Sequence, residues 1–438
     1  MAASAPPRAS PRVGGLYCAA ALAANNLSVT VIEQNAERCA GGRLACESVR
    51  AANGRTYRFE TGPSLLLLPQ VYRHSLQSLG LCMEDHLTLR KVRPSYSVHF
   101  SDGGPSPLRV GGCSSEEDGL KAMMEAEEPG SYLRMKGYMV AARANLRAGL
   151  PIFIREKLGV DECASEASCN AICCCFADVG ARLATLPAFL RAALLGGDIA
   201  EPTPLRDWPL RSHGAQLKDC FSSPRHRALM SFQDLYIGLP PSDAPAVFSL
   251  LQAIEFSEPG DTGEEDGVFY PIGGWGTIRD ALLQACKQNG VNLRFGTKAS
   301  AIVVEDGACV GVDCQQMDGM SDWGPDGEPP GVAAGTSSGG PYRLDADSVI
   351  CNADLATAEA LLPASARRSA YRERSESTQV NEVSGDWREW RFSSSTVTFL
   401  FGLDHCYDQL THHNVFIGEE EAWEGLFDAV AFEEWGRR

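Results

Sequence analysis

The residues best suited by type and spacing to do chemistry lie near the start of the chain. Gly14 and Gly15 open an Ala-rich helical stretch, and Glu33 ends the β-branched run VTVIE 18 residues after Gly15. In a dinucleotide-binding unit, glycines let the backbone approach the pyrophosphate and a helix N-terminus favours its charge. An acid about 20 residues further on accepts hydrogen bonds from the ribose. The helix, the second strand and the acid of such a unit are therefore present.

The glycine-rich turn of this unit is incomplete. Counted back from Gly15, the frame G-x-G-x-x-G falls on Ser10 and Arg12, and no apolar strand precedes it. An arginine at the central position places a side chain where the phosphates should lie. Taken alone, the fragment is as compatible with an ordinary helix–strand turn as with a nucleotide site.

Two further glycine segments, GGRL and FETGPS, strengthen the dinucleotide interpretation. Each alone is more typical of a surface turn, but their order and spacing after Glu33 make a chance occurrence of both improbable. Glycines let a loop pass close to a ligand, and an arginine binds phosphate through two hydrogen bonds. The residues concerned are Gly41, Gly42, Arg43, Gly62, Pro63 and Ser64.

A second candidate site lies at the end of DSVICNAD, which reads as a buried strand. Asn352 and Asp354 would then lie at the carboxyl edge of the sheet, where ligands bind in α/β folds. The alternative, a capping turn before the helix LATAEALL, has equal weight.

No catalytic acid or base is singled out. Glu255 and Glu258 could include a partly buried carboxylate that takes up a proton, but a solvated helix end is the favoured interpretation. His412 and His413, in a turn before Asn414, are favoured as surface or hydrogen-bonding residues.

The composition limits the class of protein. With 39 Lys+Arg against 56 Asp+Glu the formal net charge is −17, so we expect no nucleic-acid partner. No apolar run reaches the roughly 20 residues of a transmembrane helix, and no secretory signal is present. The 16 cysteines include a cluster at 163–175 whose spacing suits no zinc site, so we expect incidental thiols and no metal. The expected location is intracellular, with a plastid or a membrane association left open. The sequence does not indicate an oligomeric state.

The elements that must position these residues form a nucleotide-binding α/β domain interrupted by a second domain. We expect helices at 71–81 and 137–150, strands at 27–34, 96–100 and 395–404, and a disordered insertion at 317–342. The predicted division has four parts: 1–67, the first part of the nucleotide-binding domain; 68–262, a mostly helical substrate domain; 263–362, the second part of the nucleotide-binding domain; and 363–438, a return to the substrate domain.

These segments together resemble the carotenoid (phytoene) desaturases, within the FAD-dependent amine-oxidase-like flavoproteins. The resemblance spans about residues 13–430. It rests on VGGLYCAAALA with VTVIEQNAERCAGGRL and YRFETGPSLLLLPQVY, on SFQDLYIGLPPSDAPAVFSLLQAIEF with GVFYPIGGWGTI, on DSVICNADLATAEALLP, and on STVTFLFGLDHCYDQLTHHNVFIGEE.

The resemblance implies an α/β fold: a Rossmann-like FAD-binding domain with an inserted, mostly helical α+β substrate domain. It implies FAD as cofactor and dehydrogenation of a long polyene hydrocarbon, with the glycines and acids above holding the cofactor. An apolar substrate suggests contact with a membrane surface, for which IREKL and PAFLRAALL are candidates.

The sequence departs from this family at both ends. The opening strand with most of its Gly-rich turn is missing, as is the Gly-rich segment that closes over the flavin. We therefore expect a chain truncated at both ends, or a decayed homologue. Two alternatives stay open: a carotenoid isomerase or other amine-oxidase-like oxidoreductase, and a flavin-free inactive remnant.

Overall fold

The structure is a computed structural model. It describes residues 13–37, 40–51, 53–101, 107–111, 114–150, 211–256, 267–317, 340–363, 366 and 398–418. The cysteine cluster at 163–175, IREKL, PAFLRAALL, Glu258 and most of the predicted insertion at 317–342 lie outside these residues.

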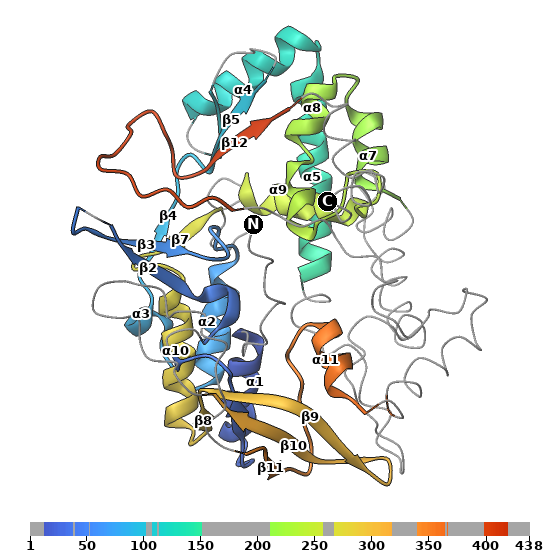
Figure 1. Cartoon of the computed structure of the whole chain (residues 1–438). Helices are drawn as coiled ribbons and strands as arrows, with labels where there is room; N and C mark the ends of the chain where they lie inside the picture. The colour runs from blue at the N-terminus through green and yellow to red at the C-terminus, as the bar shows by residue number, and fades with distance from the viewer. Residues whose placement is uncertain are drawn as a thin grey trace, which may run out of the picture.

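The first core cluster forms around two helices that pack against each other, α1 (Val13–Ala24) and α10 (Gly276–Gln288). Alanines in α1 let the helices approach closely: Ala20 is fully buried, and the Cys286 thiol donates to the Leu16 carbonyl at 3.3 Å. Beside them, β1 (Thr30–Ile32) pairs in parallel with β8 (Asn292–Arg294). The predicted strand at 27–34 is thus present but shorter, and Figure 1 shows this cluster in the lower half of the molecule.

Two further helices pack on the first core cluster, α2 (Pro69–Ser78) and α3 (Met83–His86). The predicted division assigns them to the second domain, and the domain bounds remain a prediction. The short helix η2 (Gly42–Leu44) contributes Leu44 to the same core.

Antiparallel strands surround this cluster. They are β2 (Cys46–Arg50) with β3 (Thr56–Glu60), β4 (Leu89–Lys91) with β7 (Phe269–Pro271), and a sheet of β9 (Thr297–Glu305), β10 (Ala308–Gln316) and β11 (Tyr342–Asp345). Asp306 and Gly307 join β9 to β10 with φ angles of 50° and 80°, as a tight hairpin requires.

The second core cluster lies in the upper half of Figure 1. A sheet in the order β12 (Asn414–Ile417), β5 (Tyr96–Phe100), β6 (Leu108–Val110) packs with helices, and β12 runs parallel to β5 although it lies more than 300 residues further along the chain. The helices are α4 (Ser114–Glu127), α5 (Ser131–Leu150), α7 (His213–Cys220), α8 (Pro224–Leu229), η4 (Phe232–Ile237), η5 (Ala246–Phe248) and α9 (Ser249–Glu255). The predicted strand at 96–100 is confirmed.

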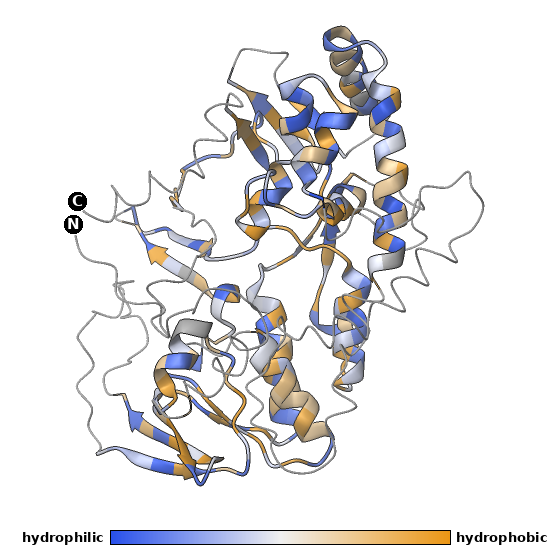
Figure 2. Cartoon of the chain, turned by 90° about the vertical axis from the view of Figure 1, so that its right-hand side faces the viewer, coloured by the Kyte–Doolittle hydropathy of each residue, from blue (hydrophilic) through white to orange (hydrophobic). Residues whose placement is uncertain are grey.

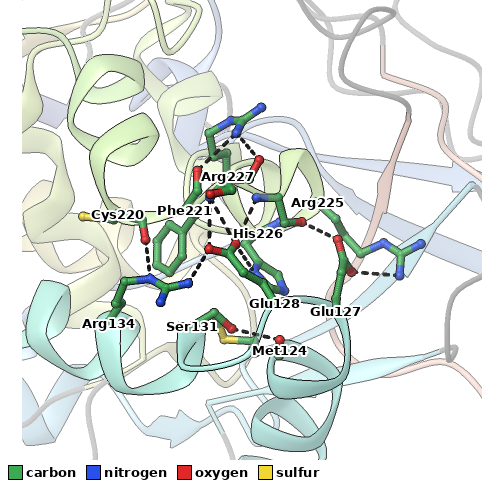
Figure 3. Close-up of polar contacts among 12 residues, drawn as sticks. Met124, Glu127, Glu128, Ser131, Arg134, Cys220, Phe221, Arg225, His226 and Arg227 are labelled. Atoms are coloured by element: carbon green, nitrogen blue, oxygen red, sulfur yellow. Dashed lines mark hydrogen bonds and ion pairs between the residues drawn. The ribbon is translucent and has the colours of Figure 1, made fainter.

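A polar clamp at the junction of α4 and α5 fixes α8 (Figure 3). The Glu128 carboxylate accepts from the backbone N–H groups of Ser222 and Ser223 at 3.1 and 3.0 Å and pairs with Arg134. Arg225 pairs with Glu127 at 3.2 Å. Burial acts to raise the pKa of Glu128, but the two amide hydrogen bonds together with the charges of Arg134 and His226 lower it below its ordinary value. The clamp therefore favours the ionised carboxylate.

Two predicted strands are wrong. The stretch 347–354, expected as a buried strand, forms none, and Ile350 is 63% exposed. Residues 398–404 of the expected strand at 395–404 are likewise unpaired, and Phe401 is 75% exposed. Both segments have the composition of a strand, but among the described residues no neighbouring strand pairs with them.

No described helix has both the length and the apolar character needed to cross a membrane, and hydrophilic residues are interspersed along the long helix α5 (Figure 2). Every cysteine that the structure describes is a free thiol.

Candidate functional site

The amino end of α1 carries the first predicted site residues. Gly14 and Gly15 lie in its first turn, where backbone N–H groups have no partner within the helix. The Gly15 N–H donates to Oδ1 of Asn352 at 2.9 Å. A Cβ atom on Gly15 would lie 3.0 Å from that oxygen, so the approach of Asn352 favours glycine here. The structure thus brings Gly14, Gly15 and Asn352 together, with an acceptor oxygen at the positive end of the helix.

Glu33 follows β1 at the carboxyl end of the parallel pair β1–β8. Its backbone N–H donates to the Arg294 carbonyl, and its own carbonyl accepts from Thr297, so the strand ends hold it in place. The side chain is 1% exposed, and Oε1 accepts from the Asn35 N–H at 2.6 Å. An acid at this edge has the position that binds ribose in α/β nucleotide folds.

The two other glycine segments contact each other. A Cβ atom on Gly62 would lie 2.1 Å from the Arg43 carbonyl oxygen, and the Thr61 hydroxyl donates to the Ala45 carbonyl at 2.8 Å. Gly41 has a φ of 87° and lies against the Arg279 side chain, while the Arg43 side chain is exposed. Gly41 and Gly62 are therefore used for close packing within the protein, and the predicted phosphate contact of Arg43 stays a prediction. Gly42, Pro63 and Ser64 belong to the same pair of turns.

Asp354 caps a helix, as one of the two sequence interpretations expected. Its carboxylate accepts from the backbone N–H and the hydroxyl of Thr357, at 3.0 and 2.8 Å, at the start of α11 (Leu355–Leu361). Of the pair at this turn, only Asn352 contacts the other predicted site residues in the described part of the chain.

Sequence reasoning missed Glu60. Its carboxylate accepts from the Trp275 N–H at 3.2 Å and from the Tyr270 hydroxyl at 3.3 Å, and so caps α10. Gly274, with a φ of 90°, makes room, because a Cβ atom there would lie 2.0 Å from Glu60 Oε1. Two features of the sequence could have indicated this contact. Glu60 directly precedes the glycine turn TGPS, and the turn YPIGGW leads into a helix whose N-cap residue, Trp275, has no capping side chain.

His413 joins the FETGPS turn to the second core cluster. Its Nε2 lies 3.3 Å from the Ser64 carbonyl and its Nδ1 3.2 Å from the Ser95 carbonyl. Burial, followed by the neighbouring His412, lowers the pKa of His413 to about 4, so its ring is neutral at neutral pH. The expectation of a hydrogen-bonding residue in a turn before Asn414 is confirmed for His413, and His412 is exposed.

The favoured interpretation of Glu255 as a solvated helix end is wrong. Its side chain is fully buried at the end of α9. Oε2 accepts from the Gln233 amide at 3.1 Å. Burial raises the pKa of Glu255 to about 7, although the Tyr96 hydroxyl and the Gln233 amide act to lower it. Ser95 next to β5 and Gln233 in η4 both donate to Glu255, so these segments pack against the end of α9.

A buried polar chain continues from Gln233 into the helices. Gln252 donates to Oε1 of Gln233 at 3.0 Å and accepts from the Tyr138 hydroxyl at 3.3 Å. That hydroxyl lies 2.7 Å from Nε2 of His213, whose Nδ1 contacts both carboxylate oxygens of Asp234 at 2.8 and 2.9 Å. Burial raises the pKa of Asp234 even beside His213. These hydrogen bonds hold the Gln233 side chain in one orientation, and Gln233 in turn orients the Glu255 carboxyl group.

The parallel β1–β8 pair, the helix α1 and the acid after β1 define a Rossmann-like dinucleotide-binding unit. Residues 13–79 match the family model of the NAD(P)-binding Rossmann-like domain, which confirms the predicted α/β class. A solved structure, an oxidoreductase from Methanosarcina mazei, aligns over 84% of this chain and 63% of its own, with a TM-score of 0.47 and 16% identity.

The resemblance to carotenoid desaturases is confirmed by curated relatives. The zeta-carotene-forming phytoene desaturase of Myxococcus xanthus is 28% identical over 95% of this chain and 63% of its own length. The phytoene desaturase of Cercospora nicotianae is 29% identical over 95% of this chain and 54% of its own length. The chain thus spans less than two thirds of these relatives.

Proposed function

We propose that this chain binds FAD and, with it, dehydrogenates a long polyene hydrocarbon of the phytoene type. The observation that carries the proposal is the similarity to phytoene desaturases along 95% of the chain, with the dinucleotide-binding unit at its start. A flavin, when bound, supplies the acceptor for a hydride taken from a C–H bond.

The residues present fit a dinucleotide at three points. The amino end of α1 already holds an acceptor oxygen, that of Asn352, where a pyrophosphate oxygen would lie. A Cβ atom on Gly14 would lie 3.6 Å from the Asn352 side chain and near no other atom, so there is space beside Gly14. In this proposal the Glu33 carboxylate would accept hydrogen bonds from ribose and the exposed Arg43 would pair with phosphate.

The substrate part of the proposal follows from hydrocarbon chemistry. A polyene offers no hydrogen-bonding group, so its affinity must come from buried apolar area and its orientation from the shape of the site. We place the polyene against the helical part of the chain. Its source would be a membrane surface, in which such a molecule dissolves.

The test is to purify the 438-residue chain, add FAD, remove unbound flavin by gel filtration and measure the flavin absorbance per chain. We expect a ratio near one. Glu33→Ala should weaken FAD binding about tenfold, the effect of roughly 1.4 kcal/mol. The control is Glu37→Ala, which removes an exposed acid paired with Lys287 and should leave binding unchanged.

The second part of the test supplies phytoene in liposomes to the FAD-loaded chain. Desaturation removes two hydrogens per step, which mass spectrometry detects. A product of unchanged mass would indicate isomerisation, and a chain that retains no flavin would contradict the proposal.

A further inference from the structure

Glu255 is a buried carboxyl group that the cofactor-binding residues do not use. It is 0% exposed, its Oε2 accepts from the Gln233 amide at 3.1 Å, and the Tyr96 hydroxyl acts on the same carboxyl group. A buried carboxylate with no cationic partner in contact is energetically costly unless the group serves a purpose or carries a proton.

Two tyrosine hydroxyls connect Glu255 to the protein surface. The hydroxyl of Tyr96 acts directly on the carboxyl group and lies 2.9 Å from the hydroxyl of Tyr236. Tyr96 is 2% exposed, whereas Tyr236 is 47% exposed. The three groups form a path from the partly exposed Tyr236 to the buried Glu255 carboxyl group, along which a proton can move between neighbouring hydroxyl and carboxyl groups.

The same path lies beside the glycine turns of the dinucleotide-binding unit. The Tyr96 ring is 5.7 Å from the ring of His413, and His413 reaches the Ser64 carbonyl at 3.3 Å. Tyr96 thus touches, through one residue, the turn at Gly62–Ser64 that the cofactor is expected to approach.

We propose that Glu255 accepts the proton released in polyene desaturation, delivered through the hydroxyls of Tyr236 and Tyr96. The inference rests on the proposed function. Glu255 acts through the tyrosines, so it is a positioning and proton-holding residue, and Tyr236 is the group that meets the substrate.

In the proposed step, two adjacent carbons each lose one C–H bond and a C=C bond forms between them. One hydrogen would leave with both electrons as a hydride, for which FAD, when bound, would be the acceptor. The other leaves as a proton to the Tyr236 hydroxyl oxygen while Tyr236 passes its own proton to Tyr96, and Tyr96 passes its proton to the Glu255 carboxylate. Each tyrosine is neutral again at the end.

The surroundings of Glu255 suit this role. Burial raises its pKa to about 7, so near neutral pH it is half ionised and can take up and return a proton. The titratable groups facing Glu255 are Tyr96 from β5 and Tyr236 from η4. The Asp234–His213 pair is further away and is linked to Glu255 through the hydrogen bonds of Tyr138, Gln252 and Gln233. Burial also raises the pKa of both tyrosines, so they stay neutral and relay rather than store the proton.

The first measurement needs no flavin. The infrared carboxyl band of the chain, recorded against pH, should show one group titrating near pH 7 that is absent in Glu255→Gln. Its titration should shift upward in Tyr96→Phe, because the lost hydroxyl had lowered the pKa. Absence of such a carboxyl group overturns the inference.

The second measurement uses the FAD-loaded chain with phytoene. We expect Glu255→Gln to lower kcat about 100-fold or more with little change in KM, the usual contribution of a proton acceptor, and to abolish the loss of kcat below about pH 7. Glu255→Asp should recover part of the rate, and Tyr236→Phe, which keeps the ring, should lower it. Glu84→Gln, at an exposed acid in α3, is the control.

The outcomes separate the two proposals. An active wild type whose rate and pH profile are unchanged by Glu255→Gln overturns the role of Glu255 and leaves the proposed function standing. A wild type without bound flavin or desaturation overturns the proposed function, and this inference with it.

Discussion

Replacing Glu255 by glutamine should stabilise the folded chain at alkaline pH and not at acid pH. The carboxyl group is fully buried and its pKa rises from the ordinary 4.5 to about 7. Folding therefore favours the protonated form. The wild type keeps its full stability from this group below pH 4.5 and loses it as the pH rises from 4.5 to about 7. A glutamine side chain carries no charge at any of these pH values, so the variant escapes this loss.

The magnitude follows from the pKa difference. At about 1.4 kcal/mol for each pKa unit, the ionised carboxylate costs about 3 kcal/mol of folding free energy above about pH 8. Part of this, roughly 0.8 kcal/mol, is already lost at about pH 5, so the advantage of the variant should grow by about 2.5 kcal/mol between pH 5 and pH 8. Glutamine can still accept from Gln233, so the packing at the end of α9 is kept.

Urea unfolding at half-unit pH steps, followed by circular dichroism, measures this difference. The matched control is Glu84→Gln, because the Arg73 hydrogen bond holds the pKa of Glu84 below its ordinary range and the group does not titrate between pH 5 and 8. Its profile should run parallel to that of the wild type. A difference between Glu255→Gln and wild type that stays constant or shrinks with rising pH would refute the reasoning.

Two further variants test the contacts that build the site. Gly62→Ala should destabilise by about 2 kcal/mol or more in urea unfolding, because its Cβ would clash with the Arg43 carbonyl, whereas Gly119→Ala, in α4 with open space around it, should be neutral or stabilising. Glu128→Gln should cost about 1–3 kcal/mol by losing the charged partner of Arg134. The loss should shrink as the pH falls from the ordinary 4.5 of a glutamate through the lowered pKa of Glu128, because the wild-type carboxylate is then itself protonated. An equal effect of the two alanine variants, or a pH-independent effect of Glu128→Gln, would contradict these contacts.

The local parts of the fold were predictable from the sequence because their signals are local. The Ala-rich run gives α1, the β-branched run gives β1 and Glu33, and Asp354 three residues before Thr357 gives a helix cap. In each case a few neighbouring residues determine the backbone hydrogen bonds.

The expectations that failed depend on distant partners. The stretches at 347–354 and 398–404 have strand composition, but a strand needs a neighbour, and none pairs with them in the described part of the chain. Glu60 accepts from the backbone N–H of Trp275, the N-cap residue of α10 and 215 residues later, which no local pattern reveals. Glu255 precedes a polar stretch of sequence and reads as a helix end, yet it is buried against β5, which lies more than 150 residues earlier, and against η4.

The proposed chemistry would lie where the two core clusters meet. A flavin held at α1 and the glycine turns would lie on the first cluster, whereas the proton acceptor must be shielded from water to have a pKa near neutrality, and Glu255 beside the second cluster is so shielded. The connection is made by short contacts: β4 with β7 in the sheet, and His413 between Ser64 and Ser95. A neutral imidazole carries a single N–H, so His413 lies between the two carbonyls and donates to one of them, and it adds no charge at this junction. A cation at this position would lower the pKa of Glu255 and remove the proton affinity on which the relay depends. The burial that makes His413 neutral and the burial that raises the pKa of Glu255 therefore support the same function.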